Sequence, residues 1–568
     1  MSMVRTSKPL LGMILLLLAS VAGAATARPQ APTRGPGHAA IASAHKLATL
    51  AGFEVLDEGG NAFDAAVAVA STLAVVEPQS SGIGGGFFAI LHFAASNSET
   101  MLDAREVAPA AVSSSLYVGK EGKPNRDTAL NGPLAAGIPG EPAGLVWMAS
   151  HYGKLPLAKS LAPAIRIASE GFKPSTRFLA AVDQRQKVLA RYPGSRALLL
   201  PGGKPPAAGE IFRNPDMAKT LKLIADKGDA GFYQGALAHA MVDAVRAAGG
   251  NWSLADLANY RARERTPITI DYKGARIVTV APPSSGGVAM AEIFNILRHI
   301  DLNAMDSAHR VHYIIEAMRR AFRDHNAYLG DPDFVKMPLK MLLSPFYADG
   351  LRASILPDKA TPSSMLPPAS NADVGMHTTH FSIIDADGNM VAATLTVNTH
   401  FGSAFVAPGT GFVLNNEMDD FALVPGAPNA YGLRGNKANA PEGGKRMLSS
   451  MSPTIVFAPH RIGVLGSPGG STIITQVFEG ILGFINGKSA QDIVAKPRFH
   501  HQYLPDLVYT EPGVFSTKTD RALEAMGYTL KSRKPWGFMN MVIWNLGDNT
   551  LEAASDPRGG GVGLGKVE

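Results

Sequence analysis

The stretch TTHFSIIDADGNMVAATLTV, residues 378–397, decides the fold of this chain. Residues 378–384 and 390–397 are rich in β-branched and aromatic side chains, which favour strands. Between them, Asp385-Ala-Asp-Gly-Asn has the composition of a tight turn. The pattern predicts a β-hairpin that begins at Thr378.

The regions around this hairpin differ in character. Upstream, residues 356–376 are rich in Pro, Ser, Asp and Ala without hydrophobic periodicity, which predicts an exposed linker. Helices are predicted over 61–74, through much of 155–250 and over 307–328. Downstream, strands are predicted at 411–414, 454–457 and 462–465, and the last of these runs into Gly-Ser-Pro-Gly-Gly-Ser and a helix from about Thr472. Both types of secondary structure therefore contribute to the fold.

The composition indicates a globular, exported protein. Of 568 residues, 46% are hydrophobic and 18% charged, enough apolar content for a large core. Residues 1–24 have the form of a signal peptide: Arg5 and Lys8, then an apolar run too short to span a bilayer, then small residues. We expect a periplasmic or secreted product with no membrane anchor in the mature form. The absence of cysteine excludes disulfides, thiolate metal sites and a cysteine nucleophile.

The charge pattern gives no support to nucleic-acid binding. The formal charge of +6 falls to about +4 without Arg5 and Lys8, and no Lys/Arg run exceeds two residues. The histidines show no helical His-Glu-x-x-His pattern, so no zinc site is predicted. We expect neither a metal nor a cofactor.

Thr378 is the candidate nucleophile. A threonine hydroxyl is a poor nucleophile by itself, but an N-terminal threonine has an α-amino group, with a pKa of about 7.7 to 8.0, that can act as its general base. If the Thr378 hydroxyl attacks the carbonyl of His377, an N-to-O acyl shift gives an ester that water hydrolyses, and the amine is freed. One residue would then serve both self-cleavage and catalysis.

Several motifs, in this order, resemble those of the γ-glutamyltranspeptidase family over nearly the whole mature chain. Besides the Thr-Thr-His strand start they are Glu58-Gly-Gly-Asn-Ala-Phe-Asp-Ala-Ala-Val-Ala, Ser81-Gly-Ile-Gly-Gly-Gly-Phe, Pro282-Pro-Ser-Ser-Gly-Gly, Leu329-Gly-Asp-Pro-Asp-Phe, Leu448-Ser-Ser-Met-Ser-Pro-Thr, Gly466-Ser-Pro-Gly-Gly-Ser and Ser555-Asp-Pro-Arg. The resemblance implies an α+β fold of the N-terminal-nucleophile (Ntn) hydrolase type, a four-layer αββα sandwich. It also implies cleavage before Thr378 into a large subunit, 25–377, and a small subunit, 378–568, which form one interlocked heterodimer.

The resemblance assigns residues to the two charged groups of a γ-glutamyl substrate. Arg105 matches the family arginine that pairs with the α-carboxylate, a task suited to a forked guanidinium. Ser449 and Ser450 match the serines that donate hydroxyl hydrogen bonds to that carboxylate. Glu417 and Asp420, three residues apart, can face one point in a turn or short helix, and they match the ammonium site.

The remaining assignments concern the reacting centre. Asn398 matches the asparagine that contacts the glutamyl moiety, and Thr396, on the same strand face, matches the threonine that supports the nucleophile. Gly469 and Gly470, just before a predicted helix, match the oxyanion hole. Residues 425–446, centred on Tyr431, resemble the family's lid loop. His400 stands where the family often has a smaller polar residue, which bears on acceptor preference.

The predicted function is that of a γ-glutamyltransferase and glutathione hydrolase. Thr378 takes the γ-glutamyl group of glutathione or a related donor as an ester, which water or an amino acid or peptide acceptor resolves. One alternative is a glutaryl or cephalosporin acylase of the same architecture, although a glutaryl group has no ammonium for Asp420 to meet. A second alternative is a periplasmic binding protein that keeps the pocket and never matures.

Overall fold

The computed structural model describes residues 28–119, 122–366, 378–424 and 426–565. The predicted signal peptide, residues 367–376 of the predicted linker and His377 lie outside these ranges. None of the helices in the described ranges is long and apolar enough to cross a membrane.

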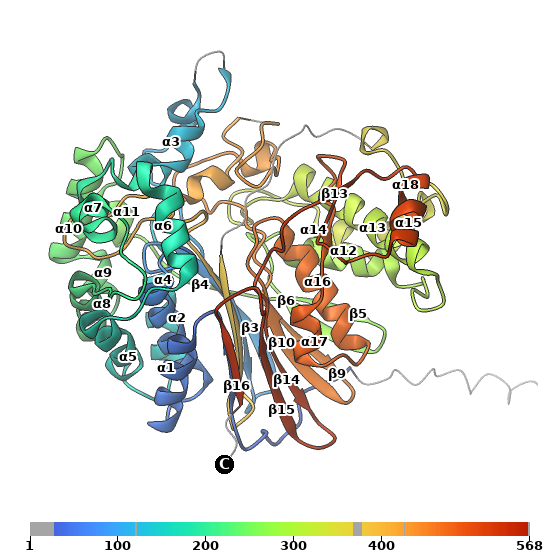
Figure 1. The fold of residues 1–568 in the computed structure, drawn as a ribbon, viewed down its shortest axis with the longest axis horizontal. Helices are drawn as coiled ribbons and strands as arrows, with labels where there is room; N and C mark the ends of the chain where they lie inside the picture. Colours follow the sequence, from blue (N-terminus) through green and yellow to red (C-terminus); the bar gives the residue numbers. More distant parts are fainter. Residues whose placement is uncertain (1–27, 120–121, 367–377, 425, 566–568) are drawn as a thin grey trace, which may run out of the picture.

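Two antiparallel sheets form the centre of the molecule (Figure 1). The seven-stranded sheet has the order β16-β1-β7-β8-β2-β3-β4 and the six-stranded sheet the order β15-β14-β10-β9-β6-β5. The strands of the first are β1 (Ala40–Ser43), β2 (Gly86–Phe93), β3 (Ser98–Ala104), β4 (Arg263–Arg265), β7 (Thr379–Ile384), β8 (Met390–Thr396) and β16 (Val562–Gly565). Those of the second are β5 (Ile268–Tyr272), β6 (Ala275–Thr279), β9 (Thr454–Ala458), β10 (Arg461–Gly466), β14 (Asn540–Asn545) and β15 (Thr550–Ser555). A separate small sheet contains β11 (Phe499–His500), β12 (Val508–Thr510) and β13 (Leu530–Ser532).

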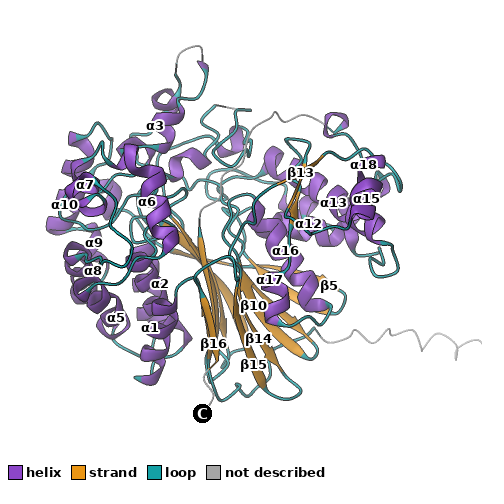
Figure 2. Cartoon of the chain, viewed as in Figure 1, coloured by secondary structure: helices purple, strands orange, loops and turns teal. Residues whose placement is uncertain are grey.

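Helices cover the outer face of each large sheet, as Figure 2 shows. On the seven-stranded sheet lie α1 (Lys46–Asp57), α2 (Ala62–Val76) and α4 (Glu141–Tyr152), with further helices outside them: α3 (Arg126–Leu130), α5 (Leu157–Glu170), α6 (Thr176–Leu189), α7 (Pro193–Leu199), α8 (Pro215–Lys227), α9 (Asp229–Tyr233), α10 (Gly235–Ala247) and α11 (Leu254–Ala258). On the six-stranded sheet lie α12 (Gly286–Leu297), α16 (Thr472–Ile485) and α17 (Ala490–Ala495), flanked by α13 (Ser307–Tyr328), α14 (Leu339–Leu342), α15 (Pro345–Ala353) and α18 (Thr517–Ala525). The predicted four-layer αββα sandwich is confirmed.

The predicted hairpin is the β7–β8 pair at the centre of the first sheet. Every residue of both strands is buried, because helices cover one face and the second sheet covers the other. Phe381 and Ile383 face α2 and its neighbours, whereas Ile384 joins the core between the sheets. The turn is held by Asp385, whose side chain accepts hydrogen bonds from the backbone N–H of Asp387, Asn389 and Ala62. The hairpin is therefore tied to the start of α2.

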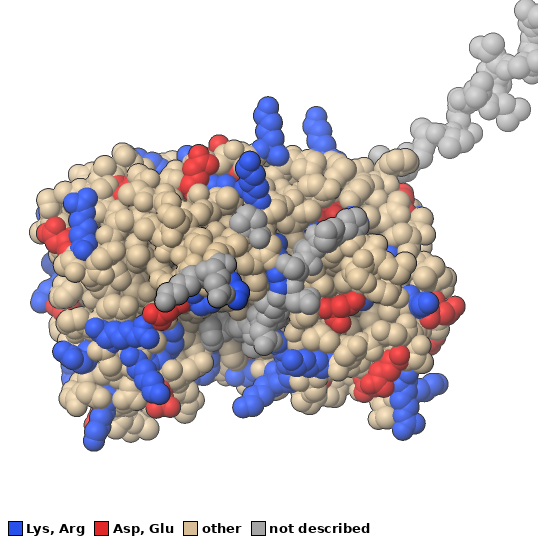
Figure 3. Space-filling model, turned by 90° about the horizontal axis from the view of Figure 1, so that it is seen from above, with Lys and Arg blue, Asp and Glu red and all other residues tan. Residues whose placement is uncertain are grey.

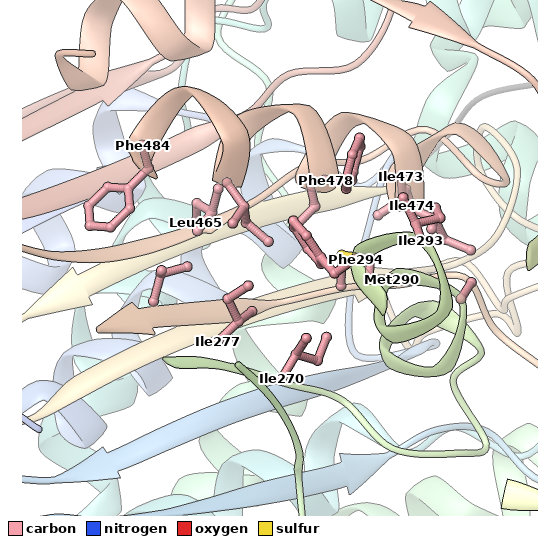
Figure 4. Packing of buried hydrophobic residues seen from close by; sticks show 14 of the residues in the cluster. Ile270, Ile277, Met290, Ile293, Phe294, Leu465, Ile473, Ile474, Phe478 and Phe484 are labelled. Carbon is pink, nitrogen blue, oxygen red and sulfur yellow. The ribbon is translucent and has the colours of Figure 1, made fainter. Parts of the chain in front are cut away.

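A second core fills the space between the six-stranded sheet and its helices. In Figure 4, Phe478, Ile474 and Ile473 of α16 point toward Phe294, Ile293 and Met290 of α12. These side chains are at most 1% exposed, and burial of each large apolar side chain contributes about 1.5–3 kcal/mol. This packing fixes α16 against β10, so the loop between them, 467–471, is held from both sides.

Most secondary-structure predictions are confirmed: the helices at 61–74 and 307–328, the strands at 454–457 and 462–465, and the helix from Thr472. The strand predicted at 411–414 is wrong. This segment forms only an isolated bridge between Val413 and Val406. Its apolar side chains are buried against the helices outside the first sheet, so their hydrophobicity reflects burial rather than strand pairing.

Strands from both sides of Thr378 alternate within each large sheet. In the first, β7 and β8 lie between β1 and β2, and in the second, β9 pairs with β6. The segments before and after Thr378 therefore share both sheets, and neither could form this core alone.

Candidate active site

Thr378 directly precedes the central strand β7, and it lies opposite another threonine of the hairpin. Thr379 pairs with Leu395 across the hairpin, so continuing the register by one residue places Thr378 opposite Thr396. Thr378 and Thr396 are 5% and 3% exposed and line one cavity. The Thr396 hydroxyl oxygen accepts a hydrogen bond of 2.7 Å from the backbone N–H of Asn398. The candidate nucleophile is therefore buried at the edge of the cavity, directly before the strand pair.

The base of the cavity is a buried ion cluster. Arg105, which is 1% exposed, contacts Glu417 at 2.9 Å and Asp420 at 2.7 Å. Both carboxylates come from one 3₁₀ turn, Glu417–Asp420, in which residues three apart lie on the same face. The prediction that these two side chains face one point is confirmed.

Burial and charge act against each other in this cluster. Burial alone would lower the pKa of Arg105, but the neighbouring carboxylates, first among them Glu417, outweigh it and raise this pKa above its ordinary value. Burial raises the pKa of Glu417 well above its ordinary value, although Arg105 opposes the shift. Burial also raises the pKa of Asp420. A guanidinium buried with two carboxylates can bind a ligand carboxylate only if it gives up part of this pairing.

Two oxygens of the cavity wall are poised to accept hydrogen bonds. Asn398 Oδ1 and Glu417 Oε1 are buried and have no hydrogen-bond partner among the described residues. Asn398 is held in place by its amide nitrogen, which donates to the backbone oxygen of Asn416 at 2.9 Å, and it has a positive φ of 72°. A buried acceptor without a partner is unfavourable, so a ligand donor such as an ammonium group would be stabilised here.

Ser449 and Ser450 form another wall. Both are buried and line the cavity. The backbone oxygen of Ser449 accepts hydrogen bonds from the side chains of Ser284 and Ser285, at 3.4 and 2.6 Å. This explains the Pro-Pro-Ser-Ser-Gly-Gly motif, which holds the two serines at the cavity.

The segment predicted to be a lid lines the cavity through Asn429, Tyr431 and residues 433–435. Tyr431, only 4% exposed, donates a hydrogen bond of 2.7 Å from its hydroxyl to the backbone oxygen of Asn398. Asn429 donates from its side chain to Asp420 at 3.0 Å. About 40 Å³ remains free inside, which is room for only one or two water molecules. This space is too small for a ligand the size of an amino acid in the arrangement that the structure describes.

Gly469 and Gly470 present two backbone N–H groups at the N-terminus of α16. Neither N–H donates a hydrogen bond within the described part of the chain. The glycines have φ values of 142° and 58°, and a side chain at either would overlap its surroundings: Gln476 at Gly469, and the Tyr431 ring at Gly470. Free donors at a helix N-terminus favour an anion, as an oxyanion hole requires.

All but one of the predicted site residues line this cavity; the exception is Gly469, which lines a neighbouring cavity that also reaches Thr378. His400 is in that second cavity too. The sequence did not single out His325, a cavity residue in the last turn of α13 whose pKa burial lowers to about 4. The side chain is therefore neutral near pH 7. The only signal in the sequence was the position of His325 near the polar end of the predicted helix.

The fold and this site define a class. A four-layer sandwich of two antiparallel sheets between helices, with a buried threonine directly before a central strand and two glycine N–H groups at the cavities it lines, is an N-terminal-nucleophile hydrolase. Among solved structures, the chain is similar to the cephalosporin acylase from Bacillus halodurans, with a TM-score of 0.82 and 29% identity over 94% of this chain and 96% of that one.

Sequence comparison identifies the family. Residues 48–565 match the Gamma-glutamyltranspeptidase family. The chain is 41% identical over 542 residues to a glutathione hydrolase proenzyme of Pseudomonas sp. (strain A14), covering 93% of this chain and 94% of that protein. It is 40% identical over 527 residues to the glutathione hydrolase proenzyme of Escherichia coli (strain K12), covering 91% and 90%. The chain belongs to the γ-glutamyltranspeptidase family.

Proposed function

We propose that the chain is a γ-glutamyltransferase and glutathione hydrolase whose nucleophile is Thr378. One observation carries the choice of substrate: the cavity beside Thr378 contains a buried guanidinium and, facing it, carboxylate and amide oxygens. A γ-glutamyl group has a carboxylate for the first and an ammonium for the second.

Maturation begins with the peptide bond between His377 and Thr378. The Thr378 hydroxyl oxygen attacks the carbonyl carbon of residue 377, the C–N bond breaks, and an ester to Thr378 remains. Water hydrolyses this ester, leaving a carboxyl group on residue 377 and a free α-amine on Thr378. That amine serves as general base for the same hydroxyl. Small and large subunits, 378–568 and 25–377, stay together because they share both sheets.

Catalysis repeats this chemistry on the donor. The Thr378 hydroxyl attacks the γ-carbonyl carbon, and its proton passes through the α-amine to the departing nitrogen. The N–H groups of Gly469 and Gly470 stabilise the oxyanion, a contribution of about 2.7–4 kcal/mol per donor. The C–N bond breaks and a γ-glutamyl ester remains. Water or an acceptor amine attacks this ester, the C–O bond to Thr378 breaks, and the hydroxyl is restored.

Arg105 and its neighbours hold the donor. When the lid opens, the donor α-carboxylate takes a place beside Arg105 and the hydroxyls of Ser449 and Ser450. The ammonium group lies against Asp420, Glu417 and the side-chain oxygen of Asn398. When Arg105 gives up part of its pairing with Glu417 or Asp420, the substrate carboxylate takes the place of the lost carboxylate contact.

The acylase alternative is tested by comparing γ-glutamyl and glutaryl p-nitroanilides. Charge-assisted hydrogen bonds to the ammonium are worth about 1.5–3 kcal/mol each, so kcat/KM for the γ-glutamyl compound should be at least ten times higher. Asp420→Asn should shrink this preference. Asp243→Asn, an exposed change on α10, is the matched control and should leave it intact. Equal rates for the two anilides in the natural protein would overturn the proposal.

Export is proposed from residues 1–24. Their signal-peptide pattern supports a periplasmic or secreted protein. Intact mass spectrometry of the protein from the periplasmic fraction should give two chains, and the mass of the larger one should show that residues 1–24 are absent. A protein that stays as one band would favour the binding-protein alternative, against which the family membership argues.

A further inference from the structure

A second cavity, of about 260 Å³, meets the first one at Thr378. Its walls come from α6, from the segment 535–538 and from the loop that precedes α16. Thr378 lines both cavities, whereas Gly470 lines only the first and Gly469 only the second. The candidate nucleophile and oxyanion donors therefore lie at the junction of two separate spaces.

The two cavities suit different parts of the substrate. With the glutamyl group held beside Arg105, the scissile bond lies at Thr378 and the departing amine extends away from the first cavity. An acceptor amine attacks the ester from the position that the departing amine has left, because transfer is the reverse of ester formation. The second cavity is the space available on that side.

Arg177 is the cationic group of the second cavity. Its side chain is 24% exposed, and one terminal nitrogen contacts Glu77 at 3.3 Å. Its guanidinium lies 3.8 Å over the ring centroid of Phe538. The remaining nitrogens, Nε and Nη2, donate no hydrogen bond to any described residue. The ion pair with Glu77 and the ring of Phe538 hold the guanidinium in place, and its other N–H groups can donate to a ligand. Such a group is suited to binding a carboxylate.

The charges around this cavity favour an anion. Arg185 adds a second positive charge on α6, and Glu77 is the carboxylate that faces Arg177. His400 is neutral near pH 7, because burial, then Arg177 and Arg185, lower its pKa to about 3. Figure 3 shows that both basic and acidic side chains occur on one face of the molecule.

We propose that the second cavity is the subsite for the acceptor and for the leaving amine, and that Arg177 binds their carboxylate. The ligand class is an amino acid or short peptide with a free C-terminal carboxylate, such as the leaving group of glutathione. This inference rests on the proposed function, and it names the residue that makes such acceptors better than their amides.

The test uses one donor and two acceptors. With γ-glutamyl-p-nitroanilide as donor, kcat/KM is measured for glycylglycine and for glycylglycine amide, corrected for the fraction of unprotonated amine. The natural protein should prefer the acid about tenfold or more, as expected for a charge-assisted hydrogen bond. In Arg177→Gln the ratio should fall to near one. An unchanged ratio in this variant would overturn the inference.

A second set of variants leaves the contact between Arg177 and Glu77 intact. Gln184 is exposed, lines the same cavity and lies two turns further along α6. Gln184→Lys should raise the acid-to-amide ratio and Gln184→Glu should lower it, by about two- to fivefold in each direction. Gln186→Glu, the same change on the same helix but outside the cavity lining, should leave the ratio at its natural value.

These variants keep the inference testable if Arg177→Gln does not mature. In that case, Gln184 variants that behave like Gln186→Glu would overturn it. Donor hydrolysis without acceptor separates the two levels of the argument. If the natural protein does not hydrolyse the donor, the proposed function fails and this inference with it; if it does and the acid-to-amide ratio ignores Arg177 and Gln184, only this inference fails.

Discussion

Replacing Gly470 with alanine should disable the oxyanion hole while leaving the fold intact. An alanine Cβ at this position would lie 2.2 Å from Cδ1 and 2.4 Å from Cε1 of the Tyr431 ring. Ordinary contacts need more than 3.4 Å, so the ring or the backbone must shift by about 1 Å. The φ of 58° adds about 1–2 kcal/mol of strain for a residue with a side chain.

The expected loss follows from which part shifts. If the backbone moves, the Gly470 N–H leaves the oxyanion, and removal of one such donor lowers kcat about 10²–10³-fold. If the ring moves, the Tyr431 hydroxyl loses its hydrogen bond to Asn398, a loss of about 0.5–1.5 kcal/mol in lid closure. We expect the first effect to dominate because Tyr431 is buried on all sides.

The assay is kcat for hydrolysis of γ-glutamyl-p-nitroanilide at saturation, with the processed fraction measured on a denaturing gel. Gly483→Ala on α16 is the matched control, because its Cβ would meet only the Ile493 side chain, whose nearest atom is Cγ1 at 3.0 Å. The double variant Gly470→Ala/Tyr431→Ala removes the clash but keeps the φ strain, and should recover part of the rate. A kcat for Gly470→Ala within threefold of the natural value would refute the reasoning.

Three further predictions concern maturation, the lid and pH. Thr378→Ala should give one uncut, inactive chain and Thr378→Ser a cut one, as judged by intact mass spectrometry; efficient cutting of the alanine variant would contradict self-processing. Tyr431→Phe should speed amide hydrogen exchange in residues 426–446 by about two- to tenfold, since the closed lid loses a hydrogen bond worth about 0.5–1.5 kcal/mol; unchanged exchange would show that this bond does not hold the lid. Burial raises the pKa of Glu479 from 4.5 to about 7, so between these pH values the folded state keeps a proton that the unfolded state loses. The free energy of unfolding therefore falls as the pH rises through this window, by up to about 3 kcal/mol. We therefore compare the uncut Thr378→Ala chain with the same chain carrying Glu479→Gln in urea unfolding between pH 5 and 8. The free energy of unfolding of the Glu479→Gln chain should rise relative to that of its parent as the pH increases, and parallel pH profiles would contradict this prediction.

Local patterns were enough for the elements around the site. The β-branched runs on either side of Asp385-Ala-Asp-Gly-Asn predicted the β7–β8 hairpin, and the glycine-rich turn before Thr472 predicted the start of α16. These signals work because strand preference, turn chemistry and helix starts depend on residues within a few positions of each other. The strand predicted at 411–414 failed for the opposite reason: burial by distant helices produced an apolar run that local pattern could not distinguish from a strand.

The chain alone also determined which residues were candidates. The resemblance of the motifs to those of the γ-glutamyltranspeptidase family selected Thr378, the glycine pair and the charged residues of the cavity, and their chemistry suits an N-terminal nucleophile and a γ-glutamyl substrate. What the tertiary structure decided is where they meet. Arg105 and Asp420, 315 residues apart in sequence, form a 2.7 Å contact, and the lid leaves about 40 Å³ beside them.

The paired state of Arg105, the packing of Tyr431 on Gly470 and the second cavity with Arg177 could not be predicted from the chain. Each depends on how side chains from distant elements fill one volume, and packing density, not local sequence, decides whether a contact or a cavity results. The sequence determined the chemistry available to this protein. Its tertiary structure decided which groups share a space, and therefore which substrate ends they can bind.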